Sequence, residues 1–419
     1  MVKNKLDKVN LGKNLYIIEA TLEYLVSILV AGSFLATLTK QLGIRDELTG
    51  IISSFISLGC AFQLLSVFAK PKRNKPLIVV MSIINQILFT SLYIIPLTNF
   101  ASNTKIVLFI IVIVFAYMIY YFVHPKKINW LMSLVEDGKR GTFTANKEII
   151  SLLSGTIFTF AMGAVVDHFK DKGNLKTALI LSAIVLFSLT LLHTLSMVFT
   201  VEKEEPQAKK NNLINTIKKL LKNKNVLKIT LIFILFYVAK DISIPFYSTY
   251  QINDLGFSIK LISAMTMIGS VARMILSRFW GKYADKTSFA KMIEKCFLLL
   301  AVAYLFVTFA TPFTGKVMFI IYYTFHGLAL AGINNAITNL VFDYVSHESR
   351  SDSLAVCQAF SGIIGFLATV AVSPLIGIIQ GNNNYIFGFP IYAQQMLSFA
   401  SFIITILTAI YIRKSFIKK

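Results

Sequence analysis

The chain has 419 residues, of which 56% are hydrophobic and 15% charged, and its formal net charge at pH 7 is +21. A water-soluble globular protein cannot keep that much apolar side chain away from its surface, so the composition excludes this class. The basic excess would suit a nucleic-acid partner, but the lysines and arginines gather in short segments between long apolar ones. An integral membrane protein explains both features.

Apolar blocks of roughly 20 residues recur along the whole chain, which is the length that a helix needs to cross a bilayer core of about 30 Å. The twelve blocks are 15–40, 48–69, 76–97, 105–134, 143–167, 176–200, 226–251, 257–280, 292–311, 315–343, 352–379 and 392–413. We expect no cleavable signal peptide, because the first block is too long and no small-residue cleavage site follows it. The predicted fold is all-α and membrane-embedded, with twelve transmembrane helices.

The distribution of Lys and Arg predicts the orientation. With the first residue in the cytoplasm, about 31 of the 41 Lys and Arg fall on that side and about 8 on the other. Positive charge is enriched in cytoplasmic loops and is attracted to anionic lipid. We therefore expect a multi-pass protein of the cytoplasmic (cell) membrane with both termini in the cytoplasm, membrane lipid around it and no nucleic-acid partner.

The longest polar stretch, 201–225, separates six predicted spans from six others. Five aliphatic residues within it recur at helical spacing opposite lysines, which suggests an amphipathic helix on the inner leaflet. A plain tether between two bundles is the simpler interpretation. We predict an N-terminal bundle of six helices at 1–200, a cytoplasmic linker at 201–225 and a C-terminal bundle of six helices at 226–419.

The two halves look like repeats of each other. Leu42-Gly43 aligns with Leu255-Gly256, and segment 135–148 aligns with 345–358. The two alignments have nearly the same sequence offset and join matching topological positions, which indicates a parallel repeat of six spans. Transporters built in this way bind their substrate near the membrane midplane, at the interface of the repeats.

The segment after the eighth span reads Gly281-Lys-Tyr-Ala-Asp285-Lys286 and resembles the Gly-x-x-x-Asp-Arg/Lys loop signature of the major facilitator superfamily. The loops at Arg140 and Arg350, each preceded by acidic residues, resemble the loop after the fourth span in that family. The resemblance implies a transporter that works by alternating access, as a monomer in most relatives, with these residues in gating roles. We expect Gly281 to allow close helix approach and Asp285 to latch one conformation.

Two features depart from the family pattern. In the first half, Lys72 stands where the acidic residue of the loop signature would be, so we expect an inner latch on one side only. The fifth span contains Gly155 and Gly163 but no Gly-Pro motif of the kind found in drug antiporters, which argues against multidrug efflux.

Ionisable side chains inside spans are candidate functional residues, since each costs about 2.5–3.5 kcal/mol at mid-bilayer on insertion scales. Glu19 and Glu23 share a face of the first span. We expect Glu19 to be solvated near the inner surface, and the deeper Glu23 to carry a coupled proton, with Asp241 as the alternative carrier. Lys240 and Asp241 are adjacent and point about 100° apart, so we do not expect them to neutralise each other; an inter-helix salt bridge is the alternative to a cavity role.

Candidate substrate contacts lie mainly on the fourth and tenth spans, where the repeat places His124 opposite Asn334. Whether Lys126 and Lys127 face the cavity or snorkel to the cytoplasmic interface stays open at this point. For Arg273 in the eighth span, a structural ion pair is preferred to substrate contact. The predicted substrate-binding residues are His124, Lys126, Lys127, Lys147, Lys240, Asn334, Asn335 and Asn339.

Within the predicted cavity, the basic residues slightly outnumber the acidic ones, which favours an anionic or zwitterionic solute such as an organic acid, a phosphorylated metabolite or an amino-acid derivative. These basic residues are Lys126, Lys127, Lys147, Lys240 and Arg273. We predict a proton-coupled secondary active transporter, a symporter or an antiporter. An exporter of amphipathic compounds or lipids is the first alternative, and a non-transporting membrane sensor or assembly partner is the second. The sequence has no nucleophile–base set and no metal-ligand spacing, so we expect no enzyme, no catalytic residue, no metal and no cofactor.

Overall fold

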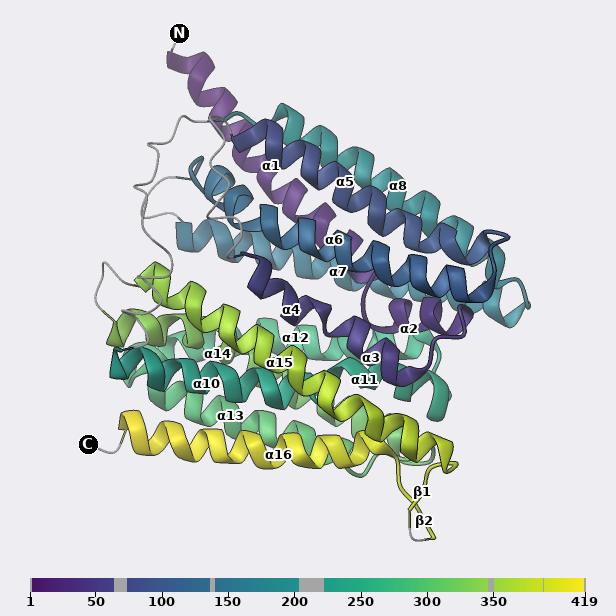
Figure 1. Ribbon diagram of the computed structural model, residues 1–419. Coiled ribbons are helices and arrows are strands. Elements are labelled where there is room, and N and C mark those ends of the chain that lie inside the picture. Colours follow the sequence, from purple (N-terminus) through teal and green to yellow (C-terminus); the bar gives the residue numbers. More distant parts are fainter. Residues whose placement is uncertain are drawn as a thin grey trace. The chain divides into compact units, whose positions relative to one another are not determined.

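The computed structural model describes residues 2–63, 74–135, 140–202, 222–345, 350–386 and 388–417 (Figure 1). Over these residues the backbone is helical apart from short connections and one antiparallel hairpin, in which Tyr385 pairs with Pro390. The architecture is therefore all-α, as the apolar blocks predict.

The first half of the chain forms α1 (Val2–Leu29), α2 (Gly32–Gln41), α3 (Asp46–Ser53), α4 (Phe55–Phe62), α5 (Asn74–Ile94), η2 (Ile95–Leu97), α6 (Ser102–Met132), α7 (Arg140–Asp171) and α8 (Leu175–Phe199). The second half forms α10 (Lys224–Asp241), α11 (Ile244–Thr249), η3 (Tyr250–Asp254), α12 (Ile259–Lys286), α13 (Phe289–Val307), α14 (Gly315–Tyr344), α15 (Arg350–Gly381), β1 (Tyr385–Ile386), β2 (Phe389–Pro390), α16 (Ala393–Ile412) and η5 (Arg413–Ile417). Each predicted span overlaps at least one of these helices.

Within the described residues, nine helices are long and apolar enough to cross a membrane, and α1 with α2, bent by 40° at the break between them, forms a tenth. The two other predicted spans coincide with α13 and with the short helices α3 and α4. Helix α13 carries Lys291, Glu294 and Lys295 in its first two turns, which lowers its apolar character. The all-α membrane fold is confirmed, and the described helices are consistent with twelve spans.

Two spans at equivalent places in the halves are broken by local chemistry. Gly32, at the start of α2, has a φ of +54°, which an L side chain adopts only with strain. Pro245 stands in the first turn of α11 and lacks the N–H that would continue α10. The second break leaves Asp241 as the last residue of α10.

The repeat is visible in the helix bounds. Helix α3 begins at Asp46 and α12 at Ile259, each just after a glycine with positive φ: Gly43 at +72° and Gly256 at +67°. The starts of α3 and α12, and likewise those of α6 and α14, are separated along the chain by the same interval as Leu42 and Leu255. Helices α7 and α15 each have 32 residues, and their starts are separated by the interval of the second sequence alignment. The pseudo-symmetric halves are therefore confirmed by geometry.

The chain divides into two compact units. Unit 1 comprises Met1–Ile44, Phe62–Ala208 and Ser258–Ser263, and unit 2 comprises Arg45–Ala61, Lys209–Phe257 and Ala264–Lys419. Helix α3 thus groups with unit 2, and the first turn of α12 with unit 1. The division at 1–200 and 226–419 stays a prediction, and most of the predicted linker lies outside the described residues.

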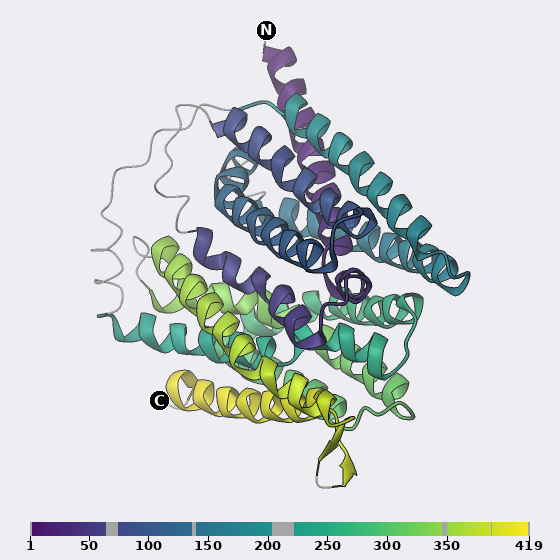
Figure 2. The ribbon, with the colours of Figure 1, turned by 45° about the vertical axis from the view of Figure 1, so that its right-hand side comes forward.

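In unit 1, α1 packs against α7 and α8, and α5 packs against α6 and α8 (Figure 1, Figure 2). In unit 2, α13 packs against α14 and α16, and α10 and α3 both pack against α15. These contacts bring α1, α6 and α8 round one buried region of unit 1, and α10 and α15 together in unit 2. Both regions contain ionisable side chains.

Candidate functional site

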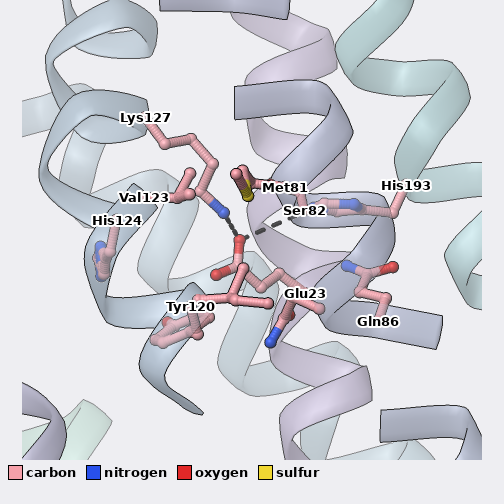
Figure 3. Close-up of a pocket in the computed structure, with 11 residues that line it drawn as sticks. Glu23, Met81, Ser82, Gln86, Tyr120, Val123, His124, Lys127 and His193 are labelled. Atoms are coloured by element: carbon pink, nitrogen blue, oxygen red, sulfur yellow. Dashed lines mark ion pairs between the residues drawn. The ribbon is translucent and has the colours of Figure 1, made fainter. Parts of the chain in front are cut away.

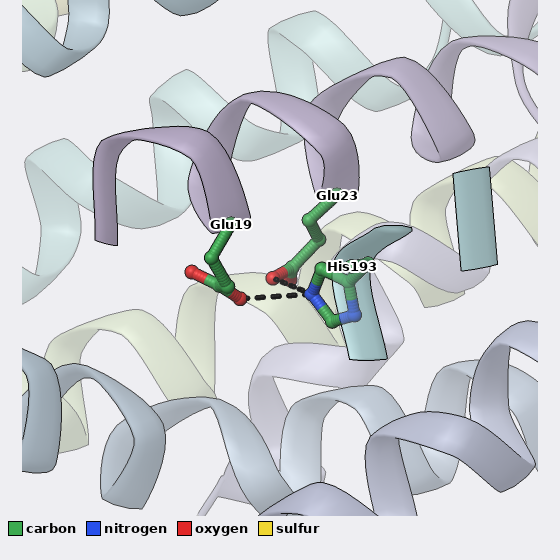
Figure 4. A group of neighbouring side chains, drawn as sticks. All are labelled: Glu19, Glu23 and His193. Atoms are coloured by element: carbon green, nitrogen blue, oxygen red, sulfur yellow. Dashed lines mark hydrogen bonds and ion pairs between the residues drawn. The ribbon is translucent and has the colours of Figure 1, made fainter. Parts of the chain in front are cut away.

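A buried ionic cluster lies inside unit 1, formed by Glu19 and Glu23 of α1, Lys127 of α6 and His193 of α8. Figure 4 shows Glu19, Glu23 and His193, and Figure 3 shows Lys127 beside Glu23. The two glutamates are four residues apart, so they project from one face of α1. Lys127 Nζ donates to Glu19 Oε1 at 2.8 Å and also forms an ion pair with Glu23 Oε2. Glu19 is 1% exposed, so the expectation that it is solvated near the inner surface is wrong: Lys127 and His193 cover it.

His193 closes the cluster from the side of α8. Its Nε2 lies 2.9 Å from Glu19 Oε1 and 3.7 Å from Glu23 Oε2, and its side chain is fully buried. Sequence reasoning did not select this residue. The available signal was a lone histidine inside an apolar span, but its partner Glu19 is 174 residues away along the chain.

Three members of the cluster are residue types that can bind a metal ion. Donor atoms of Glu19, Glu23 and His193 lie within 4.8 Å of one another, a grouping that the linear spacing of these residues does not reveal. Lys127 Nζ, however, contacts both carboxylates, so the chain itself supplies a cation at this place. We therefore assign the cluster no metal.

Charge balance explains why these side chains are held together. An ionised group buried without a partner costs several kcal/mol, and removing one member of a buried ion pair typically costs about 3–5 kcal/mol. Here two carboxylates share one ammonium and one imidazole, all within hydrogen-bond or ion-pair distance. Because each of the two carboxylates contacts both Lys127 and His193, a change of charge on one member is felt by the others.

The cluster borders a small pocket with a cavity volume of about 10 Å³ (Figure 3). Its lining residues are Glu23, Met81, Ser82, Asn85, Gln86, Ile119, Tyr120, Val123, His124, Lys127 and His193. That is about the space that one water molecule needs, so in this conformation the side chains themselves fill the site. Gln86 Oε1 and His193 Nδ1 are buried and have no hydrogen-bond partner among the described residues.

Three other predicted substrate contacts belong to unit 1. His124 lines the pocket, with its ring centroid 5.3 Å from that of Tyr120. Lys147, on α7, holds its ammonium 5.1 Å from the ring centroid of Tyr16, a cation–π contact. Lys126 is half-buried on α6. Of the two adjacent lysines on α6, Lys127 is the one that lines the pocket.

Unit 2 holds a second ionic pair on α10, and here one expectation is wrong. Lys240 Nζ lies 3.2 Å from Asp241 Oδ1, so the adjacent residues do neutralise each other. The angle of about 100° separates the Cβ directions, but a lysine has a flexible four-carbon stem that can turn back along the helix. The same ammonium is 3.3 Å from Ser57 Oγ and 4.3 Å from the Tyr237 ring centroid.

Asp241 is 2% exposed and is enclosed by α15. The Thr369 hydroxyl donates to the Asp241 backbone oxygen at 2.6 Å. A Cβ on Gly365 would overlap Asp241 Oδ2 and would lie 3.1 Å from Tyr237 Cβ. The carboxylate therefore fits against α15 only because position 365 is a glycine.

For most of the remaining predicted site residues, the structure describes the backbone but not the side chain. Asn334 and Asn335 are in α14, and Arg140 and Arg350 begin α7 and α15; their side chains, like that of Asp285, lie outside the described set. Asn339 is half-buried on α14.

Gly281 and Lys286 lie within α12, so the loop signature is helical in this structure. A Cβ at Gly281 would meet no described atom within 4 Å, and the close helix approach expected there is not observed. Lys72 lies outside the described residues.

Comparisons with known proteins agree on the family. A family model described as Major Facilitator Superfamily matches residues 20–369. No curated protein matches the chain.

Among solved structures, a variant of the nucleoside transporter NupG is similar with a TM-score of 0.69 at 16% identity, covering 97% of this chain and 100% of its own. The POT family transporter PepTSo has a TM-score of 0.70 at 12% identity, with 96% and 97% covered. A bacterial homologue of the human lysosomal transporter Spinster has a TM-score of 0.63 at 13% identity, with 97% and 94% covered. Identities this low establish the shared fold alone.

Proposed function

Because the chain belongs to the major facilitator superfamily, we propose that it is a proton-coupled secondary active transporter of a small anionic or zwitterionic solute. It works as a monomer in the cytoplasmic membrane, with both termini in the cytoplasm, by rocking 1–200 against 226–419. The observation that carries the proposal is the buried cluster of Glu19, Glu23, Lys127 and His193, three of whose members line a pocket. Intramembrane ionisable residues usually mark substrate or proton pathways.

Glu23 is the proposed proton carrier, since it lines the pocket and its carboxylate contacts Lys127. A proton on that carboxylate removes its charge and ends the ion pair. The Lys127 ammonium then binds an anionic group of the solute in place of the Glu23 carboxylate. One proton and one anionic group therefore enter the cluster together, and the net charge of the cluster is unchanged. Release of both restores the original pair, which couples the two fluxes.

The solute class follows from what the pocket offers. Lys127 supplies a charged donor, and Gln86 Oε1 is a buried acceptor without a partner among the described residues. A molecule with a carboxylate or phosphate and a nearby hydrogen-bond donor satisfies both groups. Nucleoside and peptide transporters share the fold with this chain at 16% and 12% identity, which is too low to transfer a substrate, so the pocket alone supports the solute class.

Asp241 is the alternative proton carrier, because it is buried on α10 beside Lys240. Substitutions distinguish the two candidate proton carriers. Glu23→Gln imitates a permanently protonated Glu23, and Asp241→Asn imitates a permanently protonated Asp241. We expect Glu23→Gln to abolish the pH dependence of solute binding and Asp241→Asn to leave it intact. The opposite result would assign the proton to Asp241.

The first experiment is thermal stability of the purified protein against organic acids, sugar phosphates, amino acids, neutral sugars and lipophilic cations at two pH values. A ligand at about 100 times its dissociation constant stabilises by about 2.7 kcal/mol. We expect anions or zwitterions to stabilise the protein, more strongly at the lower pH. Hits are then tested for uptake into vesicles that carry a proton gradient.

The key variant is Lys127→Met combined with Glu19→Gln, which removes one charge of each sign and keeps the cluster balanced. It should fold and lose stabilisation by anions. Lys176→Ala, an exposed lysine on α8, is the matched control and should keep it. Stabilisation by lipophilic cations only would favour the amphipathic exporter, and binding without uptake would favour the sensor. Transport indifferent to pH and to both carboxylate substitutions would refute proton coupling.

A further inference from the structure

The connection between α15 and α16 lies in the longest part of the chain that carries no charge. Residues 353–412 contain no Asp, Glu, Lys or Arg, although they include two spans and the segment between them. Charged residues are the types most often found where a loop meets water. A connection that lacks charges and is rich in aromatic residues is better suited to the headgroup region of a bilayer, which accepts amphipathic rings.

The hairpin formed by β1 and β2 is held in one direction at its base. Asn383 and Asn384 have φ of +54° and +60°, a left-handed turn that asparagine adopts more readily than most residues. The Asn384 N–H donates to the Ile379 oxygen at 2.9 Å, and the Asn384 oxygen accepts the Ile391 N–H at 2.9 Å. The Asn384 side-chain amide donates to Asp254 Oδ1 at 3.2 Å. These bonds fix the course of the chain where it enters and leaves the hairpin.

The hairpin leaves unit 2 on the side of α16, at the end of that helix opposite to the C-terminus (Figure 1, Figure 2). In both views it extends beyond α16, whose other side packs against α13 and α10. The exposed apolar residues of α16 recur every three or four positions, so they form one stripe that faces away from the unit. They are Met396, Phe399, Ile403, Leu407 and Ile410. In a membrane-spanning helix such a stripe contacts acyl chains, so the hairpin reaches over the lipid that borders α16.

Exposed aromatic side chains lie on the hairpin and on the neighbouring connection between α13 and α14. They are Tyr385 (53% exposed), Phe389 (68%), Phe309 (59%) and Phe313 (96%). The two segments meet at the start of α16, where Gln395 Nε2 donates to the Ala310 oxygen at 2.6 Å. Large apolar side chains that are grouped and exposed to this degree mark a surface that an apolar partner covers. We call these four residues the aromatic anchor.

Phe313 is held outward by its own turn. The backbone N–H of Thr311 donates to the Thr314 hydroxyl at 3.0 Å, and the backbone N–H of Thr314 donates to the Thr311 hydroxyl at 3.1 Å. The interval that relates the two repeats pairs Phe313 with Phe100, and each of them stands two residues before the span that follows. Phe100 is also exposed. A phenylalanine at the same span boundary in both repeats fits the depth at which spans meet the headgroups.

We propose that the aromatic anchor lies in the lipid headgroup region and holds the end of α16 at a fixed depth, at the outer surface in the orientation expected from the basic loops. Its rings insert among the lipids beside the apolar stripe of α16. Because the anchor carries no charge, it binds lipid by apolar and aromatic contact, and its binding is independent of anionic lipid and of salt. The basic cytoplasmic loops differ, since their attraction to lipid depends on both.

Photo-crosslinking of the full chain in nanodiscs of phosphatidylcholine identifies what covers the anchor. The photoreactive residue p-benzoylphenylalanine replaces Phe389 in one variant and Phe313 in another. Both side chains are exposed, so both variants should fold. We expect the main product to be the chain joined to a lipid, seen by mass spectrometry of the intact protein. Its yield should stay the same when phosphatidylglycerol replaces part of the lipid and when salt is raised.

Two further positions serve as controls for the same photoreactive residue. Phe399, on the apolar stripe of α16, should give the lipid product, whereas Lys172, in the equivalent connection between α7 and α8, should give much less. Two chains joined to each other would overturn the proposal and make the hairpin a contact between copies. A lipid yield at Phe389 no higher than at Lys172, or one that requires anionic lipid, would also overturn it. Because no solute is used, the outcome is independent of the proposed transport function.

Discussion

The two repeats have similar helix bounds, but their buried ionisable residues stand at different positions. In the alignment that pairs Leu42 with Leu255, Glu19 and Glu23 of α1 correspond to Ile232 and Phe236 of α10, both buried among apolar neighbours. A carboxylate at either position in unit 2 would have to find a cation that the equivalent helices do not provide. At these equivalent positions, the described residues hold the ionic cluster in unit 1 and apolar side chains in unit 2.

Unit 2 places its own charges elsewhere on the same helix. Lys240 and Asp241 correspond to Ser27 and Ile28 of α1, one turn beyond the level of the unit 1 cluster. Lys240 has a side chain that is 28% exposed, whereas Lys127 in unit 1 is 7% exposed. The two repeats thus keep similar helix bounds and the turn glycines Gly43 and Gly256, whereas the charged residues on the first helix of each half stand at different positions.

Substitution of Lys127 should have the largest effect. Lys127→Met leaves the buried Glu19 and the half-buried Glu23 with His193, which is charged only when protonated, as their remaining partner among the described contacts, and we expect a loss of about 3–5 kcal/mol of unfolding free energy. Chemical denaturation of the purified protein measures this. Adding Glu19→Gln should recover most of it, and a single variant as stable as the parent would show that the cluster is not compensated by this lysine.

Lys240→Met tests the weaker pair. Asp241 loses its cationic partner, but the Lys240 side chain is 28% exposed and the pair is therefore less completely desolvated than the unit 1 cluster, so the expected loss is about 1–3 kcal/mol. The same denaturation measurement applies, and the informative quantity is the difference from Lys127→Met. Equal losses for the two lysines would contradict the view that the unit 1 cluster is the more deeply buried.

Much of this fold was accessible from the sequence because hydropathy depends on local composition. Span positions and the repeat alignments both reappear in the helix bounds. The candidate site was harder to predict, because hydropathy does not show which helices are neighbours. The sequence indicated Glu23 and Lys127 as separate candidates but did not indicate that they form an ion pair. His193 had no visible partner, and the Lys240–Asp241 contact depends on side-chain reach, which a helical wheel omits.

Gly365→Ala probes the packing beside Asp241. The new methyl group would overlap Asp241 Oδ2 and approach Tyr237, so α10 and α15 must separate slightly. Overpacking of this kind typically costs about 1–3 kcal/mol, and one methyl group should fall near the lower end. A lowered melting temperature is expected, and Asp241→Asn should not rescue it, because the amide occupies the same space.

Gly281→Ala should have the smallest effect and the opposite sign. The position is helical and exposed, and a Cβ there meets no described atom within 4 Å, so the substitution should stabilise the protein by up to about 1 kcal/mol through helix propensity. The melting temperature measures stability, and uptake into vesicles measures gating. A more stable protein with slower transport would mean that Gly281 needs its space in another conformation, as its predicted gating role requires. Unchanged transport would remove Gly281 from the gate.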